Sequence, residues 1–116
     1  MRKEGEGDLL RIFIGESDRH EGRPLFEAIV QLARKRGLAG ATVLRGLEGY
    51  GAHSRVHTAK ILRLSEDLPM VIEIVDTPER IAEFLPTVDE MIGEGLVTLE
   101  TINVIAYRHE GSGDKD

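Results

Sequence analysis

Glycines gather at the end of one apolar, β-branched stretch of this chain, where they could bind an anion. The stretch from Ala41 to Leu44 is typical of a strand, and it is followed by three glycines: Gly46, Gly49 and Gly51. Glycines let the backbone bend and expose its N–H groups, and successive free N–H groups form a positive concavity that suits an anion. Glycines at the end of a strand are also typical of a plain bulge or loop. The pattern therefore indicates an approachable backbone and leaves both interpretations open.

Three of the four histidines lie in polar segments and are the candidate metal ligands: His20, His53 and His57. Imidazole nitrogen is a common ligand of zinc and copper. His53 and His57 would lie together on a helix, but on an extended strand they are about 13 Å apart, at about 3.3 Å per residue. Solvated loop histidines are the favoured interpretation, and a divalent-metal site is kept as the alternative.

Ser17, Asp18 and His20 come nearest to a nucleophile with its base, but they are too close in the sequence to be assumed a catalytic triad. No Gly-x-Ser-x-Gly motif is present, and the chain has no cysteine that could act as a thiolate nucleophile. We therefore expect no enzymatic activity.

The composition predicts one domain, because 116 residues are the usual length of a single domain with one core. We expect the folded unit to span residues 8–110, with flexible, charged termini at 1–7 and 111–116. The net charge of −6 argues against binding to nucleic acid. No apolar run approaches the roughly 18 residues of a membrane span, and the start lacks the apolar core of a signal peptide. We therefore expect a cytoplasmic protein without membrane insertion.

Apolar periodicity predicts two strands and a helix in the first half of the chain. Residues Leu9 to Gly15 alternate, and one face of this strand is wholly aliphatic: Leu10, Ile12 and Ile14. Pro24 begins a helical pattern that Gly37 ends, because proline suits the first helical turn and glycine the left-handed stop. The stretch from Ala41 to Leu44 is then the second strand.

The second half begins with another strand and helix. Met70 to Val75 is nearly all apolar, which is typical of a central strand buried on both sides. Thr77 and Pro78 are the expected N-cap and first residue of the helix. Pro86 falls inside this helix, so we expect a kink or a break there.

The last strand region, Leu96 to Tyr107, changes its apolar phase midway. Val97 and Leu99 occupy odd positions, whereas the later apolar residues Ile102, Val104 and Ala106 occupy even ones. Because a shift of one residue moves side chains to the other face of a sheet, we expect a bulge or corner near Glu100 and Thr101.

The order β-α-β-β-α-β predicts an α+β, ferredoxin-like fold, with two helices on one face of a four-stranded antiparallel sheet of order 4-1-3-2. In this topology three loops converge at one edge of the sheet: Glu16–Arg23, Gly49–His57 and Gly93–Gly95. Gly-rich backbone, arginines and histidines come together there, so this edge is the default binding site. Because the strands are apolar on both faces, the uncovered face should join copies of the chain.

The chain resembles the P-II nitrogen-regulatory signalling family over nearly all of its folded unit. The likeness rests on four segments in matching order and spacing: Gly40–Val43, Gly49–Gly51, Leu68–Val75 and Gly93–Gly95. More narrowly, the chain resembles an uncharacterised family of P-II-like proteins, domain of unknown function 190, in three segments: Ile14–Arg19, Gly40–Gly51 and Leu64–Pro69.

P-II proteins are trimers with their sheets inward, and adenine nucleotides bind in the clefts between their subunits. The resemblance therefore implies a homotrimer in which Gly49 and Gly51 approach an adenine nucleotide (ATP, ADP or AMP). It implies that the backbone N–H groups of Gly93, Glu94 and Gly95 wrap the phosphates, with no required cofactor.

The departures from the P-II pattern weaken the charge partners of a bound phosphate. Leu96 stands where P-II proteins carry a lysine, and the family's two late arginines fall on Tyr107 and His109, with Arg108 one position off. Replacement cations should come from other arginines, whose guanidinium forks suit phosphate: Arg19, Arg23 or Arg55. The complete set of predicted ligand-binding residues is Ser17, Arg19, Arg23, Gly49, Tyr50, Gly51, Arg55, Gly93, Glu94 and Gly95.

We expect a non-enzymatic sensor that binds a nucleotide or another small anion and engages a protein partner, such as a transporter or an enzyme, through the segment 52–67. This segment corresponds to the T-loop of P-II proteins and has no tyrosine, so the tyrosine modification known in some of them is excluded. The alternative is a metal-binding protein that resembles the copper-tolerance trimers of the same fold, with His20, His53 and His57 as ligands.

Overall fold

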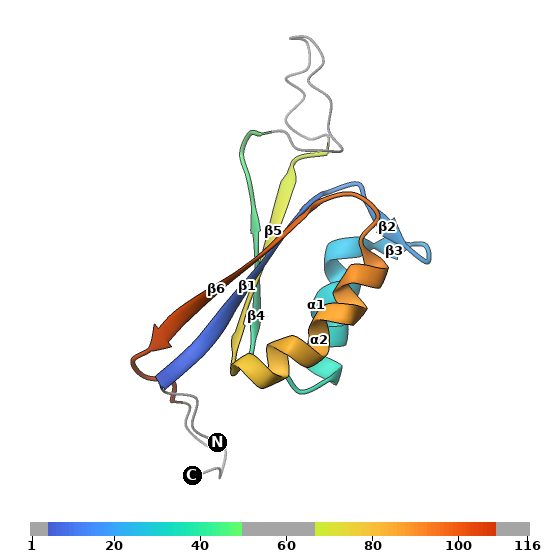
Figure 1. The fold of residues 1–116 in the computed structure, drawn as a ribbon. Helices are drawn as coiled ribbons and strands as arrows, with labels where there is room; N and C mark the ends of the chain where they lie inside the picture. Colours follow the sequence, from blue (N-terminus) through green and yellow to red (C-terminus); the bar gives the residue numbers. More distant parts are fainter. Residues whose placement is uncertain (1–4, 50–66, 109–116) are drawn as a thin grey trace.

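The computed structural model of the chain describes residues 5–49 and 67–108. Four strands form an antiparallel sheet in the order β4-β5-β1-β6, and two helices lie against one face of it (Figure 1). The elements that carry the fold are β1 (Gly5–Gly15), α1 (Leu25–Lys35), β4 (Ala41–Arg45), β5 (Pro69–Asp76), α2 (Pro78–Met91) and β6 (Leu96–Val104). The predicted ferredoxin-like architecture and its strand order are confirmed.

The sheet face that meets the helices is the hydrophobic core. Side chains alternate along a strand, and the even-numbered residues of β1 and β5, from Leu10 to Ile14 and from Met70 to Asp76, are buried on this face. Ile29 of α1 and Ile81 and Val88 of α2 are fully buried in the same core. Removing this aliphatic surface from water is the main force that holds the single chain together.

The opposite face of the sheet, here called the open face, is not covered by α1 or α2 (Figure 1). Residues that lie opposite one another in antiparallel strands share a face. The register therefore aligns one apolar row across all four strands: Leu44, Val71, Phe13 and Leu96. The next row is polar: Thr42, Glu73, Arg11 and Thr98. Leu44 and Leu96 are 48% and 55% exposed, so the apolar row is available to another surface.

Strand β6 is more regular than predicted. Its register with β1 is unbroken along the strand, so the expected bulge near Glu100 and Thr101 is wrong. Val97 and Leu99 lie on the helix side but are 38% and 49% exposed, whereas Ile102 lies on the open face. The change of apolar phase therefore reflects apolar side chains on both faces of the sheet, and β6 keeps its register with β1 throughout.

Two strands differ from their predictions in burial or extent. β5 is buried on the helix side only, and the side chains of Val71, Glu73 and Val75 are half-buried on the open face, so the prediction of burial on both sides is wrong for the single chain. β1 begins at Gly5, ahead of the predicted strand start at Leu9 and of the predicted start of the folded unit at residue 8, because its first residues pair with the end of β6. The predicted boundary at 110 and the predicted flexible segment 111–116 lie outside the described residues.

The helix ends follow the predicted chemistry closely. Thr77 caps α2, and its Oγ1 accepts a hydrogen bond from the backbone N–H of Arg80 at 3.3 Å. α2 continues through Pro86 as one helix, and its ribbon bends midway (Figure 1). Pro24 is the N-cap of α1 and not its first helical residue, while Gly37 has the expected positive φ of 83°. Neither of these helices is long and apolar enough to cross a membrane.

A small hairpin that the sequence analysis does not predict lies before α1. Its strands are β2 (Arg19–His20) and β3 (Arg23–Pro24). Its two turn residues, Glu21 and Gly22, have φ values of 51° and 82°, and two successive positive φ values are typical of a type I′ turn. Glutamate seldom adopts a positive φ, so the sequence carries no strong turn signal at this position.

Candidate functional site

One edge of the sheet collects the loops of the predicted site, in the upper part of Figure 1. β1 and β4 end at this edge, and β5 and β6 begin there, with Gly15 opposite Pro69 and Phe13 opposite Leu96. The polar segment after β1 and the turn before β6 therefore leave the sheet side by side.

Residues 16–18 connect this edge to both ends of the segment 46–68. The backbone N–H of Glu16 donates to the carbonyl of Leu68 at 2.8 Å, and the carboxylate of Glu16 pairs with Arg45, which ends β4, at 3.1 Å. The hydroxyl of Ser17 donates to Oδ1 of Asp67 at 2.7 Å, and the backbone N–H of Ser17 donates to the same oxygen at 3.1 Å. A displacement of residues 16–18 would therefore change these contacts at both ends of that segment.

The geometry around Asp67 is tight. Asp67 has a positive φ of 43°, which is uncommon for a residue other than glycine. A Cβ atom at Gly15 would lie 2.5 Å from Oδ1 of Asp67, so only glycine leaves room for this carboxylate. Asp18 fixes the adjacent turn, because its Oδ2 accepts from the N–H of Gly15 at 3.0 Å and its carbonyl accepts from the N–H of Leu25 at 2.8 Å.

A pocket of about 190 Å³ lies between this turn and the residues that lead into β6. It is lined by Asp18, Arg19, Leu25, Met91, Gly93 and Glu94. The structure thus brings Arg19 together with Gly93 and Glu94, three of the predicted ligand-binding residues. Sites for small molecules usually measure roughly 300–1,000 Å³, so a whole nucleotide would need further walls.

Close packing explains two of the glycines at this edge. Gly95 has a φ of 154°, and a Cβ atom there would lie 2.7 Å from the carbonyl oxygen of Phe13. A Cβ atom at Gly46 would lie 2.9 Å from Cγ of Pro69. A Cβ atom at Gly93 would meet nothing within 4 Å, so its backbone is open to an approaching group. Close packing therefore requires glycine at positions 46 and 95, whereas space remains beside the backbone of Gly93.

The remaining predicted residues fall elsewhere. Arg23 lies on the far side of the hairpin, where its Nη2 donates to Oε1 of Gln31 at 2.8 Å. Gly49 lies at the exposed end of the loop after β4, with its Cβ position 3.2 Å from Cγ of Pro69. The other three predicted ligand-binding residues lie outside the described residues: Tyr50, Gly51 and Arg55.

The alternative metal site gains no support from the described histidine. Nε2 of His20 lies 3.9 Å from a carboxylate oxygen of Glu21. Residues 5–49 and 67–108 contain no group of three histidine, aspartate or glutamate side chains that could hold a metal ion. His53 and His57 lie outside these ranges, so a metal site that combines them with His20 stays a prediction.

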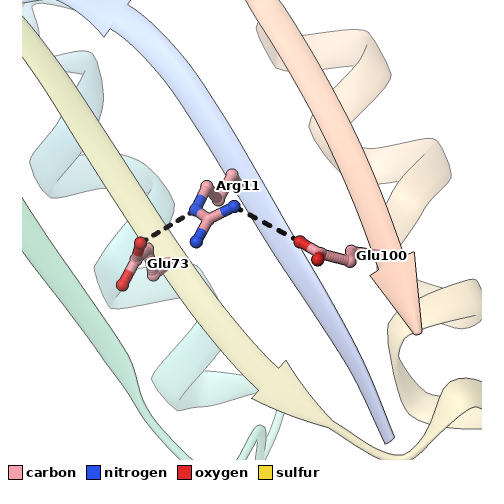
Figure 2. A network of polar contacts seen from close by, with 3 residues as sticks. All are labelled: Arg11, Glu73 and Glu100. Carbon is pink, nitrogen blue, oxygen red and sulfur yellow. Dashed lines mark hydrogen bonds and ion pairs between the residues drawn. The ribbon is translucent and has the colours of Figure 1, made fainter. Parts of the chain in front are cut away.

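An ion cluster lies on the open face and joins Arg11 to Glu73 and Glu100 (Figure 2). The sequence patterns did not predict it. Nε of Arg11 donates to Oε2 of Glu73 at 2.9 Å, and Nη1 donates to Oε1 of Glu100 at 3.4 Å. The hydrogen bond to Glu73 is the main reason why the pKa of Arg11 lies above the usual arginine value. One sign of the cluster was present in the sequence: Arg11 is a charged residue on the same face of the strand as the apolar Leu9 and Phe13.

The chain matches a known protein family. Residues 7–104 match the model of DUF190, which is described as an uncharacterized ACR. A UPF0166 protein of Aquifex aeolicus is 42% identical over 99 residues, which cover 84% of this chain and 91% of that protein. A UPF0166 protein of Methanocaldococcus jannaschii is 37% identical over 97 residues, which cover 83% of this chain and 89% of that protein. The predicted resemblance to this family is confirmed.

Solved structures of CPII from Thiomonas intermedia K12, a nitrogen regulatory PII-like protein, have a similar fold. The structure bound to ADP and bicarbonate has a TM-score of 0.57 at 20% identity, covering 85% of this chain and 88% of that one. The structure bound to ADP, AMP and bicarbonate has a TM-score of 0.55 at 18% identity, covering 85% of this chain and 92% of that one. At these identities the likeness concerns the fold alone.

Proposed function

This chain belongs to the DUF190 family, and we propose that it is a P-II-like regulatory protein that binds an adenine nucleotide in a cleft between copies of itself. The observation that carries the proposal is the 190 Å³ pocket at the loop edge, where Arg19 lies with Gly93 and Glu94. The apolar row of the open face reaches the same edge of the sheet at Leu96, two residues after Glu94 in the chain. A whole nucleotide needs further walls, and in this proposal a second copy seated on the apolar row supplies them.

Arg19 and the open backbone at Gly93 suit the phosphate end of a nucleotide, and they would bind it in the presence of the two carboxylates that also line the pocket, those of Asp18 and Glu94. Arg19 is the cation among the residues that line the pocket. Its guanidinium group would contact the phosphate in place of the lysine that P-II proteins carry at the position of Leu96. Backbone N–H groups at the open Gly93 and at Glu94 would bind phosphate oxygens. The ADP and AMP in the CPII structures support this class of ligand, and the proposal assigns no catalytic step to any residue.

The regulatory part of the proposal rests on residues 16–18. Asp18 and Arg19 line the pocket, and the two residues before them hold Arg45, Asp67 and Leu68. A ligand that moves the pocket wall would bias the segment 52–67 through these bonds, provided that it binds the two arrangements with different affinity. We expect a protein partner, such as a transporter or an enzyme, to read that segment. The homotrimer and the cytoplasmic location belong to the same proposal.

Calorimetric titration of the purified protein tests the proposal, with ATP, ADP, AMP, cyclic AMP, bicarbonate and zinc as separate ligands. We expect an adenine nucleotide to bind and Arg19→Ala to raise its Kd about tenfold or more, because a charge-assisted contact is lost. The matched control is Arg34→Ala, which removes an exposed arginine from the last turn of α1 and should leave the Kd unchanged. Equal affinities in the two variants would exclude Arg19 as the phosphate partner. Binding of zinc alone would favour the metal alternative.

A further inference from the structure

A second pocket lies on the other side of the β2–β3 hairpin, against α1. It measures about 370 Å³ and is lined by His20, Glu21, Arg23, Ala28, Gln31, Leu32, Lys35 and Met91. This volume falls within the usual range of small-molecule sites. His20 and Arg23 of the hairpin line this pocket, whereas Arg19 of the hairpin lines the pocket with Gly93 and Glu94. The hairpin therefore lies between the two pockets, and Met91 borders both.

The register of the hairpin separates its charged side chains. Arg19 lies opposite Pro24, and His20 lies opposite Arg23. Residues opposite one another share a side, and neighbours along a strand point to opposite sides. His20 and Arg23 therefore face α1 together, while Arg19 faces the pocket with Gly93 and Glu94. The turn that fixes this register uses a glutamate at φ 51°, a conformation that costs free energy and is retained where the surrounding structure requires it.

The second pocket combines an apolar floor with cations. Ala28 and Leu32 lie one helical turn apart on α1 and, with Met91 of α2, supply the apolar surface. The carbonyl oxygen of the Gln31 side chain accepts from Nη2 of Arg23 at 2.8 Å, which holds the guanidinium group over the helix. Lys35, four residues after Gln31, brings a second permanent cation to the same face of α1.

We propose that this second pocket binds a small organic anion, with an apolar body against the floor and one phosphate or carboxylate group between Arg23 and Lys35. Two cations face a single carboxylate, that of Glu21, so the pocket favours a negative ligand. The site is distinct from the proposed nucleotide cleft, and it uses Arg23 for a different ligand from that of Arg19. It requires neither a second copy of the chain nor the segment 50–66.

Phenyl phosphate is a suitable probe, because it joins a flat apolar ring to one phosphate group. We expect a titration of the full chain, followed by NMR of its backbone amides, to give saturable shifts in β2, β3 and α1. Inorganic phosphate and phenol, which each carry half of the probe, should bind more weakly. Shifts that stay linear with concentration up to about 10 mM, the limit of weak affinity, would overturn the proposal.

Lys35→Glu and Arg34→Glu are a matched pair of variants, since both reverse one charge at neighbouring exposed positions of α1. Only Lys35 lines the pocket. We expect Lys35→Glu to raise the Kd of phenyl phosphate about tenfold or more and Arg34→Glu to change it less than about twofold. Equal effects would mean that the probe senses only the general charge of the helix, and the site would be rejected.

An ADP competition separates this inference from the proposed function. Saturating ADP should leave the phenyl phosphate shifts of α1 in place, and Lys35→Glu should leave ADP affinity unchanged. If ADP fails to bind while phenyl phosphate still does, the proposed function fails and the second site stands. If ADP displaces phenyl phosphate from α1, the two pockets are one site and this inference fails.

Discussion

The two faces of the sheet are built differently. On the helix side the side chains of Leu10, Ile12 and Ile72 are fully buried within one chain. On the open face the apolar row keeps exposed leucines at both ends, and the next row holds the charged Arg11 and Glu73. One face therefore stabilises the single chain, and the other keeps an exposed apolar row, which we propose joins copies of the chain. The proposed nucleotide site combines the pocket at the loop edge with a second copy on the open face, so its completion would depend on that face.

The largest difference between the faces should appear on truncation within one strand, β5. We expect Ile72→Ala to lower the free energy of unfolding by about 3 kcal/mol, because it removes fully buried atoms and leaves a cavity. Val71→Ala, one residue away on the open face, should cost about 1 kcal/mol or less, since its side chain is only half-buried. Urea unfolding at a chain concentration low enough to keep the chain monomeric measures both losses. Equal losses would mean that the two faces are not distinct.

The next effect concerns association. Leu44→Asp places a charge at the end of the apolar row, so we expect it to convert a homotrimer to monomers without loss of secondary structure. Ile105→Asp is the matched control, because Ile105 is 80% exposed and lies after the end of β6. Light scattering gives the mass, and circular dichroism checks the fold. A wild-type chain that is monomeric at micromolar concentration would remove the cleft between copies.

The smallest effect should come from the ion cluster. Arg11→Gln would leave the carboxylates of Glu73 and Glu100 without their shared cation, so association should weaken at low salt. About 1 M salt reduces the Debye length to about 3 Å and should restore it. Light scattering at the two salt concentrations measures this change. If the variant associates like the wild type at low salt, the cluster lies outside the interface.

The ion cluster should add no pH dependence near neutrality. The hydrogen bond to Glu73 raises the pKa of Arg11 in the folded chain, so the contribution of Arg11 to stability is fully present below the usual arginine pKa and is lost only as the pH rises through the raised pKa. Denaturant titrations of the wild type and Arg11→Gln should therefore keep a constant difference between about pH 6 and pH 9. A difference that changes in this window would assign another titrating group to the cluster.

Sequence patterns predicted the fold because they record which side chains need burial. The alternation in β1 located the core, and the order of elements placed the segment after β1 beside the turn before β6. The same patterns do not record which surface provides the burial. The phase change in β6 predicted a bulge, but Val97 and Leu99 are left exposed on the helix side while Ile102 turns to the open face.

The site was harder to predict than the fold. Arg19 and Arg23 are four positions apart and looked equivalent as phosphate partners, but a two-residue turn with a positive φ at Glu21 sends them to different pockets. Local rules disfavour that turn, so the register of the hairpin could not be read from residue types. The contacts of Asp67 depend on a residue fifty positions earlier in the chain, Ser17, which no local pattern links to it.

Titration of ADP into the wild type and into Leu44→Asp tests the central claim most directly, because Leu44 belongs to the open face and does not line the pocket with Gly93 and Glu94. We expect one ADP per chain in the wild type and at least a tenfold weaker affinity, about 1.4 kcal/mol or more, in the folded monomeric variant. Undiminished ADP affinity in a folded monomer would contradict it, because the nucleotide site would then be complete within one chain.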